Sequence, residues 1–81
     1  MNPWDIVEHA ILSAAQQPAS CGRIADQAGL TPDVVKAQLV TLESKGLVAQ
    51  PMPGAGRYVL TLAGYKRMFS LAPPGAEQRA A

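Results

Sequence analysis

Apolar residues recur at helical spacing in four segments of the chain, separated by short stretches rich in proline, glycine and polar residues. Apolar positions three and four residues apart fall on one face of a helix, so each of these segments is predicted to be an amphipathic helix. Two shorter runs, the second rich in β-forming residues, favour strands. The predicted fold class is therefore mainly α with a small β-hairpin (α+β). The helices are predicted over residues 4–16, 20–30, 32–45 and 61–69, and the strands over 47–50 and 57–60.

The second and third predicted helices have clear start and stop signals. Ser20 and Thr31 are placed to accept a backbone hydrogen bond at the two helix starts, and Pro32 stands at a first helical position. Gly29 is free to adopt the positive φ that ends a helix. Only a few residues then separate the two helices. So short a turn forces them to cross steeply, as in a helix-turn-helix.

The third helix has a predicted core face and a predicted outer face. Val35, Leu39 and Leu42 stand at positions i, i+4 and i+7 and are expected to face the core together, and Gly46 is expected to end the helix. This register turns the opposite face outward. The outward positions are Pro32, Asp33, Lys36, Ala37 and Val40.

The second half of the chain predicts a hairpin followed by a helix. The segment PMPGAG, residues 51–56, is a turn-prone loop between the two strands. Thr61 is placed to cap the last helix, whose inner side is expected to carry Leu62, Tyr65 and either Met68 or Phe69. Gly64 weakens this helix by up to about 1 kcal/mol relative to alanine.

Both ends of the chain carry predictions of their own. Asn2 is placed to cap the first helix, and Trp4 either packs under that helix or lies on a partner; we expect packing, because tryptophan is mostly buried. After Leu71 the sequence APPGAEQRAA has no apolar anchor and is typical of disorder. The predicted organisation is one domain over residues 1–71 and a disordered tail over 72–81.

The net charge of +1 is not that of a strong polyanion binder, but its distribution is uneven. Acidic residues gather before residue 34, whereas the segment 34–69 has Glu43 as its single acid. If the later elements share a surface, that surface is moderately basic. The bases of this segment are Lys36, Lys45, Arg57, Lys66 and Arg67.

Several function classes are disfavoured by what the sequence lacks. Cys21 and His9 are the single cysteine and histidine, too few for a disulfide or for the four ligands of a structural zinc site. We expect Cys21 to be a small buried filler. No nucleophile–base pair, carboxylate pair or phosphate loop occurs, so we expect neither an enzyme nor a cofactor. The absence of a long apolar run and of a basic leader predicts a cytoplasmic protein without a membrane contact.

The order helix, helix, tight turn, helix, hairpin, helix resembles a winged helix-turn-helix domain over about residues 5–69. The segment SCGRIADQAGLTPDVVKAQLVTLESKGLV is similar to the second and third helices of small bacterial regulators of the MarR and ArsR type. In these regulators an alanine lies within the second helix, a Gly-Leu-Ser/Thr turn follows, and the third helix ends in Leu-Glu-x-x-Gly-Leu-Val. RYVLTLAGYKRM resembles their second wing strand and the helix after it.

The resemblance implies double-stranded DNA as the partner, with the helix 32–45 in the major groove and the wing 51–57 on the minor groove or the backbone. The outer face of this helix departs from the family pattern, which favours Ser, Thr, Gln, Arg or His there. Lys36 is left to contact guanine or phosphate, while Asp33 either accepts from cytosine or only suits the helix dipole. Arg57 is the best single candidate, as a wing arginine. The full set of implied DNA-binding residues is Arg23, Thr31, Pro32, Asp33, Lys36, Ala37, Gln38, Val40 and Arg57.

One copy of the domain offers three or four phosphate contacts, whereas a tight DNA binder makes about 6–10. A homodimer is therefore the expected form if DNA is the target. By analogy with the family, the outer helices would pair, through Trp4, Ile11, Leu12, Tyr65, Met68 and Phe69. The expected function is that of a small transcriptional regulator or a phage or plasmid accessory factor. The alternative is a protein-interaction winged helix that does not bind DNA, favoured by the apolar outer face of the third helix and the near-neutral charge.

Overall fold

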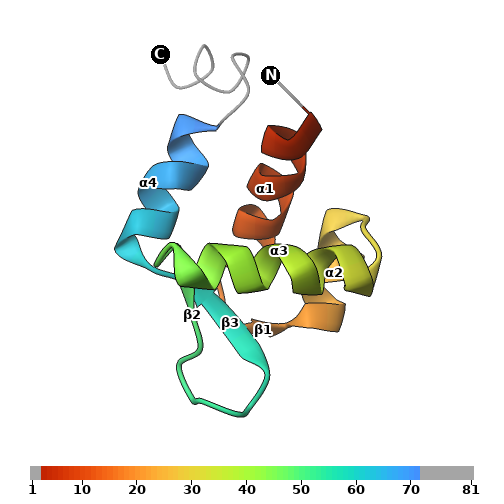
Figure 1. Ribbon diagram of the computed structural model, residues 1–81, viewed down its shortest axis with the longest axis vertical. Helices are drawn as coiled ribbons and strands as arrows, with labels where there is room; N and C mark the ends of the chain where they lie inside the picture. Colours follow the sequence, from red (N-terminus) through yellow and green to blue (C-terminus); the bar gives the residue numbers. More distant parts are fainter. Residues whose placement is uncertain (1–2, 72–81) are drawn as a thin grey trace.

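The computed structural model describes residues 3–71, which form four helices and a three-stranded antiparallel sheet (Figure 1). The strand order in the sheet is β1-β3-β2. The α+β class and the order of helices and hairpin are as predicted. The elements are α1 (Pro3–Ala14), β1 (Ala19–Ser20), α2 (Cys21–Ala28), α3 (Pro32–Ser44), β2 (Val48–Ala49), β3 (Arg57–Leu60) and α4 (Leu62–Ser70). The predicted Asn2 cap and the predicted tail at 72–81 lie outside the described residues.

The helix-turn-helix formed by α2 and α3 follows its local signals closely. The Ser20 hydroxyl accepts the Arg23 N–H at 3.2 Å, and the Thr31 hydroxyl accepts the Val34 N–H at 3.4 Å. Gly29 ends α2 with a φ of 70°, a left-handed conformation that favours glycine. The Cys21 thiol, half-buried rather than fully buried as predicted, donates to the Pro32 carbonyl at 3.4 Å and joins the two helix starts.

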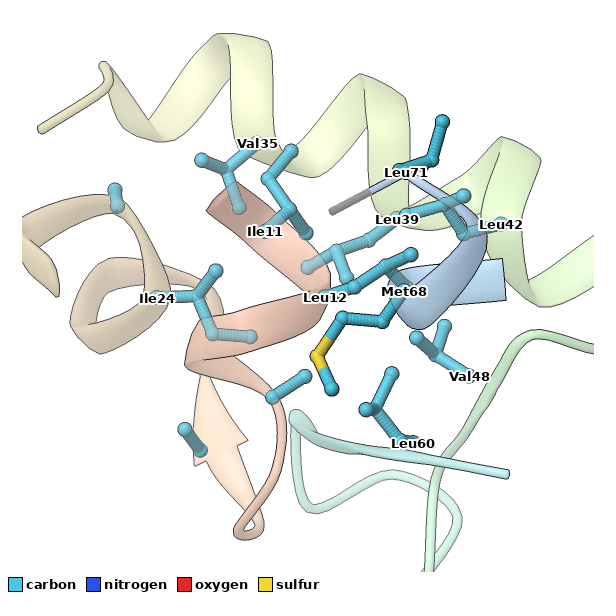
Figure 2. Packing of buried hydrophobic residues seen from close by; sticks show 13 residues of the cluster. Ile11, Leu12, Ile24, Val35, Leu39, Leu42, Val48, Leu60, Met68 and Leu71 are labelled. Atoms are coloured by element: carbon cyan, nitrogen blue, oxygen red, sulfur yellow. The ribbon is translucent and has the colours of Figure 1, made fainter. Parts of the chain in front are cut away.

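The core lies where α1, α2, α3, α4 and the sheet meet, as Figure 2 shows. Val35, Leu39 and Leu42 of α3 are all buried, which confirms the predicted inner face of that helix. No polar or charged side chain is buried between residues 3 and 71. This domain is therefore held together mainly by apolar burial. No helix in the same range is long and apolar enough to cross a membrane.

The inner side of α4 carries Met68 and the half-buried Tyr65 as predicted, but not Leu62. Leu62, expected on the inner side, is 74% exposed, whereas Gly64 and Met68 are buried. A Cβ at residue 64 would overlap the Leu47 carbonyl oxygen and lie 2.9 Å from Leu60 Cδ2. The glycine thus lets α4 approach the backbone before β2, and this contact decides which face of α4 turns inward. Thr61 caps the helix as predicted, accepting the Gly64 N–H at 3.0 Å.

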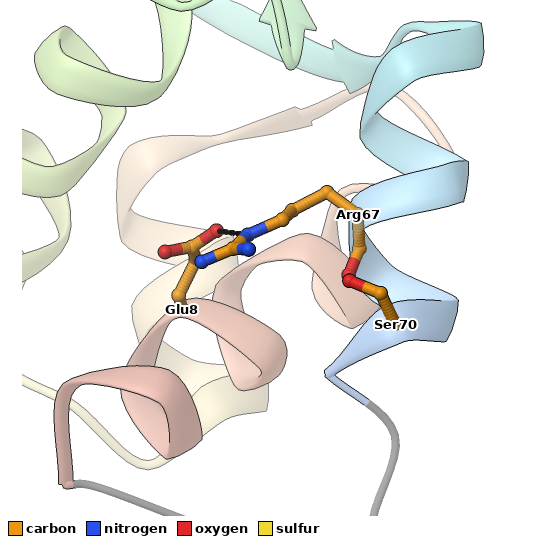
Figure 3. Close-up of polar contacts among 3 residues, drawn as sticks. All are labelled: Glu8, Arg67 and Ser70. Carbon is orange, nitrogen blue, oxygen red and sulfur yellow. Dashed lines mark hydrogen bonds and ion pairs between the residues drawn. The ribbon is translucent and has the colours of Figure 1, made fainter.

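The outer helices α1 and α4 lie side by side and are joined by an ion pair (Figures 1 and 3). Arg67 Nε donates to Glu8 Oε2 at 2.7 Å. The hydrogen bond to Glu8 and the attraction of that carboxylate raise the pKa of Arg67. The prediction that Trp4 packs under α1 is wrong, because Trp4 is 65% exposed and the apolar core begins on α1 only at Val7.

Candidate nucleic-acid interface

The candidate interface is built around the junction between β1 and α2. Ser20 is both the last residue of β1 and the N-cap of α2, and it pairs with Arg57 of β3 across the sheet. Strand pairing therefore fixes Arg57 beside the first turn of α2, where Arg23 stands. The N-terminus of a helix carries a partial positive charge that stabilises an anion. Both arginines therefore lie beside a position that favours negative charge.

Arg23 and Arg57 line one open depression of about 430 Å³. Both side chains belong to exposed residues, and neither forms an ion pair with any residue in the range 3–71. Two cations at a common hollow without a carboxylate partner make it a candidate site for an anionic group. The rest of the lining consists of Gln17, Pro18, Ala19 and Ser20.

A second, mainly apolar hollow adjoins the first one. It has a similar volume of about 430 Å³ and shares Pro18 and Arg57 with the depression described above. The remaining walls come from the wing loop between β2 and β3, through Pro51, Met52 and Ala55. Sequence reasoning did not identify this hollow, because Pro18 reaches the wing only through the pairing of β1 with β3.

The wing loop is a defined turn. The Ala55 N–H donates to the Met52 carbonyl at 3.1 Å, and Gly54 has a φ of 86°. With Pro53 and Gly54 as its central residues, the loop has the signature of a type II turn. Pro53 fixes its own φ and Gly54 accepts the positive φ that this turn needs, so the turn presents Met52, which is 69% exposed, to solvent.

The predicted outer face of α3 is observed as exposed surface. Thr31 is exposed, and Gln38, which the resemblance places among the DNA-binding residues, is half-buried. Lys36 does not line the depression that holds the two arginines, so the structure joins Arg23 to Arg57 but leaves Lys36 on the separate face of α3. The exposed positions of that face are Pro32, Asp33, Lys36, Ala37 and Val40.

The residues expected at a dimer surface divide into three groups, and the expectation is wrong for the first of them. Ile11, Leu12 and Met68 are buried in the core of the chain itself, so their side chains are not available to a partner. Tyr65 is half-buried, and its hydroxyl donates to the Gln16 carbonyl at 3.3 Å. Trp4 and Phe69 are exposed, at 65% and 66%.

Comparison with solved structures identifies the architecture. The chain superposes on ZitR of Lactococcus lactis with a TM-score of 0.66 and 19% identity, covering 83% of this chain and 46% of that one. Its similarity to ZitR in complex with DNA has a TM-score of 0.64 and 18% identity, and covers 83% of this chain and 49% of that one. The chain is also similar to a MarR family protein of Mycobacterium tuberculosis in complex with salicylic acid. That comparison has a TM-score of 0.64 and 26% identity, and covers 82% of this chain and 53% of that one. The fold is a MarR-type winged helix-turn-helix.

This winged helix spans about half the length of the solved proteins that it resembles. No protein-family model matches the sequence, and no curated protein matches it. In the terms of the fold, α2 and α3 are the helix-turn-helix, α3 is the helix that occupies the recognition position, and the loop from β2 to β3 is the wing.

Proposed function

We propose that this winged helix binds double-stranded DNA without enzymatic activity, as a transcriptional regulator or a phage or plasmid accessory factor. The observation that carries the proposal is that Arg23 and Arg57 line the same solvent-open depression beside the start of α2. The phosphate backbone of DNA is the polyanion that such a pair fits, because each phosphate neutralised releases counterions and adds to affinity. The structural likeness to a protein solved with DNA supports the same partner.

In this proposal the wing and the helix α3 have different tasks. Arg57 at the wing and Arg23 at α2 hold phosphates, and they supply most of the affinity. Thr31 and Lys36 add contacts from the first turns of α3, which lies in the major groove. Ala37 and Val40 offer only apolar contact with a thymine methyl group, and Asp33 suits the helix dipole at the start of α3. Sequence selectivity is therefore low relative to phosphate-driven affinity.

The test is a titration of labelled mixed-sequence duplex DNA by fluorescence anisotropy at several salt concentrations. Wild-type protein is expected to bind at low salt, with an affinity that falls as salt rises. For each copy of the chain on the duplex, Arg57→Ala and Arg23→Ala are each expected to lower the magnitude of the salt slope by about 0.9 and to weaken binding about tenfold at low salt. Lys66→Ala is the matched control, because this exposed base lies on α4, and it is expected to bind like wild type. Absence of binding at low salt with micromolar protein would overturn the proposal.

A second candidate function rests on one observation of α3. Val40 is 62% exposed on the face that would meet DNA, and Val34 is also exposed. Apolar groups at the centre of an exposed face are typical of protein-binding surfaces. If duplex DNA fails to bind at low salt, this face is the place to seek a protein partner, and Val40→Lys is expected to abolish that partner's binding.

A further inference from the structure

The apolar hollow of the wing has no role in holding the fold together. Its wall residue Met52 is largely exposed, and Pro51 and Ala55 are exposed as well. Exposed apolar groups contribute little to folding, so the sequence MP at the tip is not explained by packing. The hollow nevertheless has a defined support, the turn closed by the Met52–Ala55 hydrogen bond.

The charge around the hollow restricts what could occupy it. Arg57 stands at the boundary between the apolar hollow and the polar depression that also holds Arg23. No acidic residue occurs in the sequence between Glu43 and Glu77, so the wing offers its cation Arg57 without a competing carboxylate of its own. An occupant must therefore have an anionic part next to an uncharged part of low polarity. A strand of DNA has that composition, since phosphates alternate with deoxyribose rings.

We propose that the wing hollow is a deoxyribose subsite, in which Pro18, Pro51 and Met52 pack on the sugar whose neighbouring phosphate is held by Arg57 and Arg23. This inference rests on the proposed DNA binding and adds selection of the sugar to it. The minor groove of an RNA helix displays 2′-hydroxyl groups, and these are both donors and acceptors. The apolar walls offer such a hydroxyl no hydrogen-bond partner, so covering it disfavours RNA.

The experiment compares the affinities for a DNA duplex and for an RNA duplex of the same sequence, at one low salt concentration. Leaving one covered hydroxyl unpaired is expected to make wild-type protein bind the DNA at least about tenfold more tightly. Met52→Ser places a hydroxyl in the wall and is expected to reduce this DNA-to-RNA ratio at least threefold. Because both proteins meet the same two duplexes, the difference in helical form cancels when their ratios are compared.

Three variants serve as controls for the sugar contact. Met52→Leu keeps the wall apolar and is expected to keep the wild-type ratio. Leu62→Ser makes the same kind of change at an exposed position on α4, away from the wing, and is expected to keep it too. Arg57→Gln is expected to weaken both duplexes by the same factor, because phosphates occur in both. Circular dichroism melting confirms that each variant is folded.

The outcomes separate the two proposals. If wild type binds DNA but Met52→Ser has the wild-type ratio within twofold, the deoxyribose subsite is overturned and DNA binding stands. If wild type binds RNA as tightly as DNA, the subsite is overturned as well. If wild type binds no duplex at low salt, the proposed function itself fails and the subsite fails with it.

Discussion

Gly64 is a residue whose missing side chain has a structural purpose. It lies within α4 and is buried, with the Leu47 carbonyl oxygen and a Leu60 methyl group in the place of a Cβ. The Leu47 carbonyl also accepts the Thr61 N–H at 3.1 Å, so it is held in position. Helix propensity alone predicts that alanine stabilises this position, whereas the close approach predicts the reverse.

We expect Gly64→Ala to lower the free energy of unfolding by about 1–3 kcal/mol, because overpacking against a fixed backbone outweighs a propensity gain of about 1 kcal/mol. Urea unfolding followed by circular dichroism measures the change. Gly22→Ala is the matched control, since Gly22 lies in α2 with nothing within 4 Å of a built Cβ. That variant is expected to be as stable as wild type or slightly more so. A Gly64→Ala protein of wild-type stability would show that α4 can shift away from Leu47.

The Gly64 contact also explains why sequence reasoning placed Leu62 on the wrong face. The inner residues of α4 and its end are Gly64, Met68 and Leu71, at i, i+4 and i+7, the same spacing as the inner face of α3. Because the first of these positions holds a glycine, a count of apolar side chains does not recognise it. The outward position of Leu62 follows from that register.

Elements with local signals were predictable, and elements made by distant contacts were not. The start of α2, the start of α3 and the turn between them follow from Ser20, Gly29 and Thr31, whose hydrogen bonds and φ angle need only near neighbours. Strand β1 is two residues long and exists because Ala19 and Ser20 pair with Tyr58 and Arg57, nearly 40 positions later. A pattern of side chains cannot reveal so short a strand.

The candidate site also has a part that was predictable from the sequence and a part that depends on distant contacts. Arg57, as a wing arginine, and Arg23 were both among the DNA-binding residues that the family resemblance implies. Their common depression depends on the pairing of β1 with β3, and so does the apolar hollow that Pro18 completes. The residues of the site were thus largely visible in the sequence, whereas their grouping was not, because a pairing of distant strands creates it.

The contact between α1 and α4 yields a prediction about the ion pair between Glu8 and Arg67. The side chain of Arg67 is 43% exposed, so water screens the attraction, and we expect Glu8→Gln to lower the free energy of unfolding by about 0.5–1 kcal/mol. The loss is expected to shrink at high salt. Urea unfolding at two salt concentrations measures both effects. The pKa of Arg67 is raised in the folded protein. Its contribution to the free energy of unfolding is therefore present below the pKa of Arg67 in the unfolded chain, and is lost as the pH rises through the folded-state pKa.

Glu43→Gln is the control for this pair. Glu43 accepts a hydrogen bond from Gln50 at 3.2 Å and has no ion pair with a base in residues 3–71. The amide oxygen can keep that hydrogen bond, so the control removes one acidic charge alone, and a change below about 0.5 kcal/mol is expected. An equal loss in both variants would assign the effect to net charge rather than to the pair.

On the scale of the whole molecule, two surfaces lie at opposite ends. The wing is at one end in Figure 1, and the start of α1 and the end of α4 lie together at the other. Trp4 and Phe69 belong to that second end, and both are largely exposed. We propose that this end joins two copies of the chain, since exposed aromatic groups are favoured at protein interfaces. Such a pairing leaves both wings free to meet DNA.

The salt dependence of DNA binding tests this pairing. One copy that uses Arg23, Lys36 and Arg57 is expected to give a slope of about −3 in a plot of log affinity against log salt, and two copies on one duplex about twice that. Trp4→Ala combined with Phe69→Ala is expected to halve the slope and to shift the mass in sedimentation equilibrium from two copies to one. Leu62→Ala, exposed at the opposite end of α4, is expected to change neither.

A wild-type protein that sediments as a single copy at the concentrations where it binds DNA would contradict the pairing. The slope then distinguishes what remains. A value of about −3 would mean that one domain acts alone, through the arginines of the wing and α2 and the lysine of α3. A steeper value from a single copy would require bases beyond these three, and Lys45 at the end of α3 is the first to substitute, because it is exposed and lies on the same helix-turn-helix.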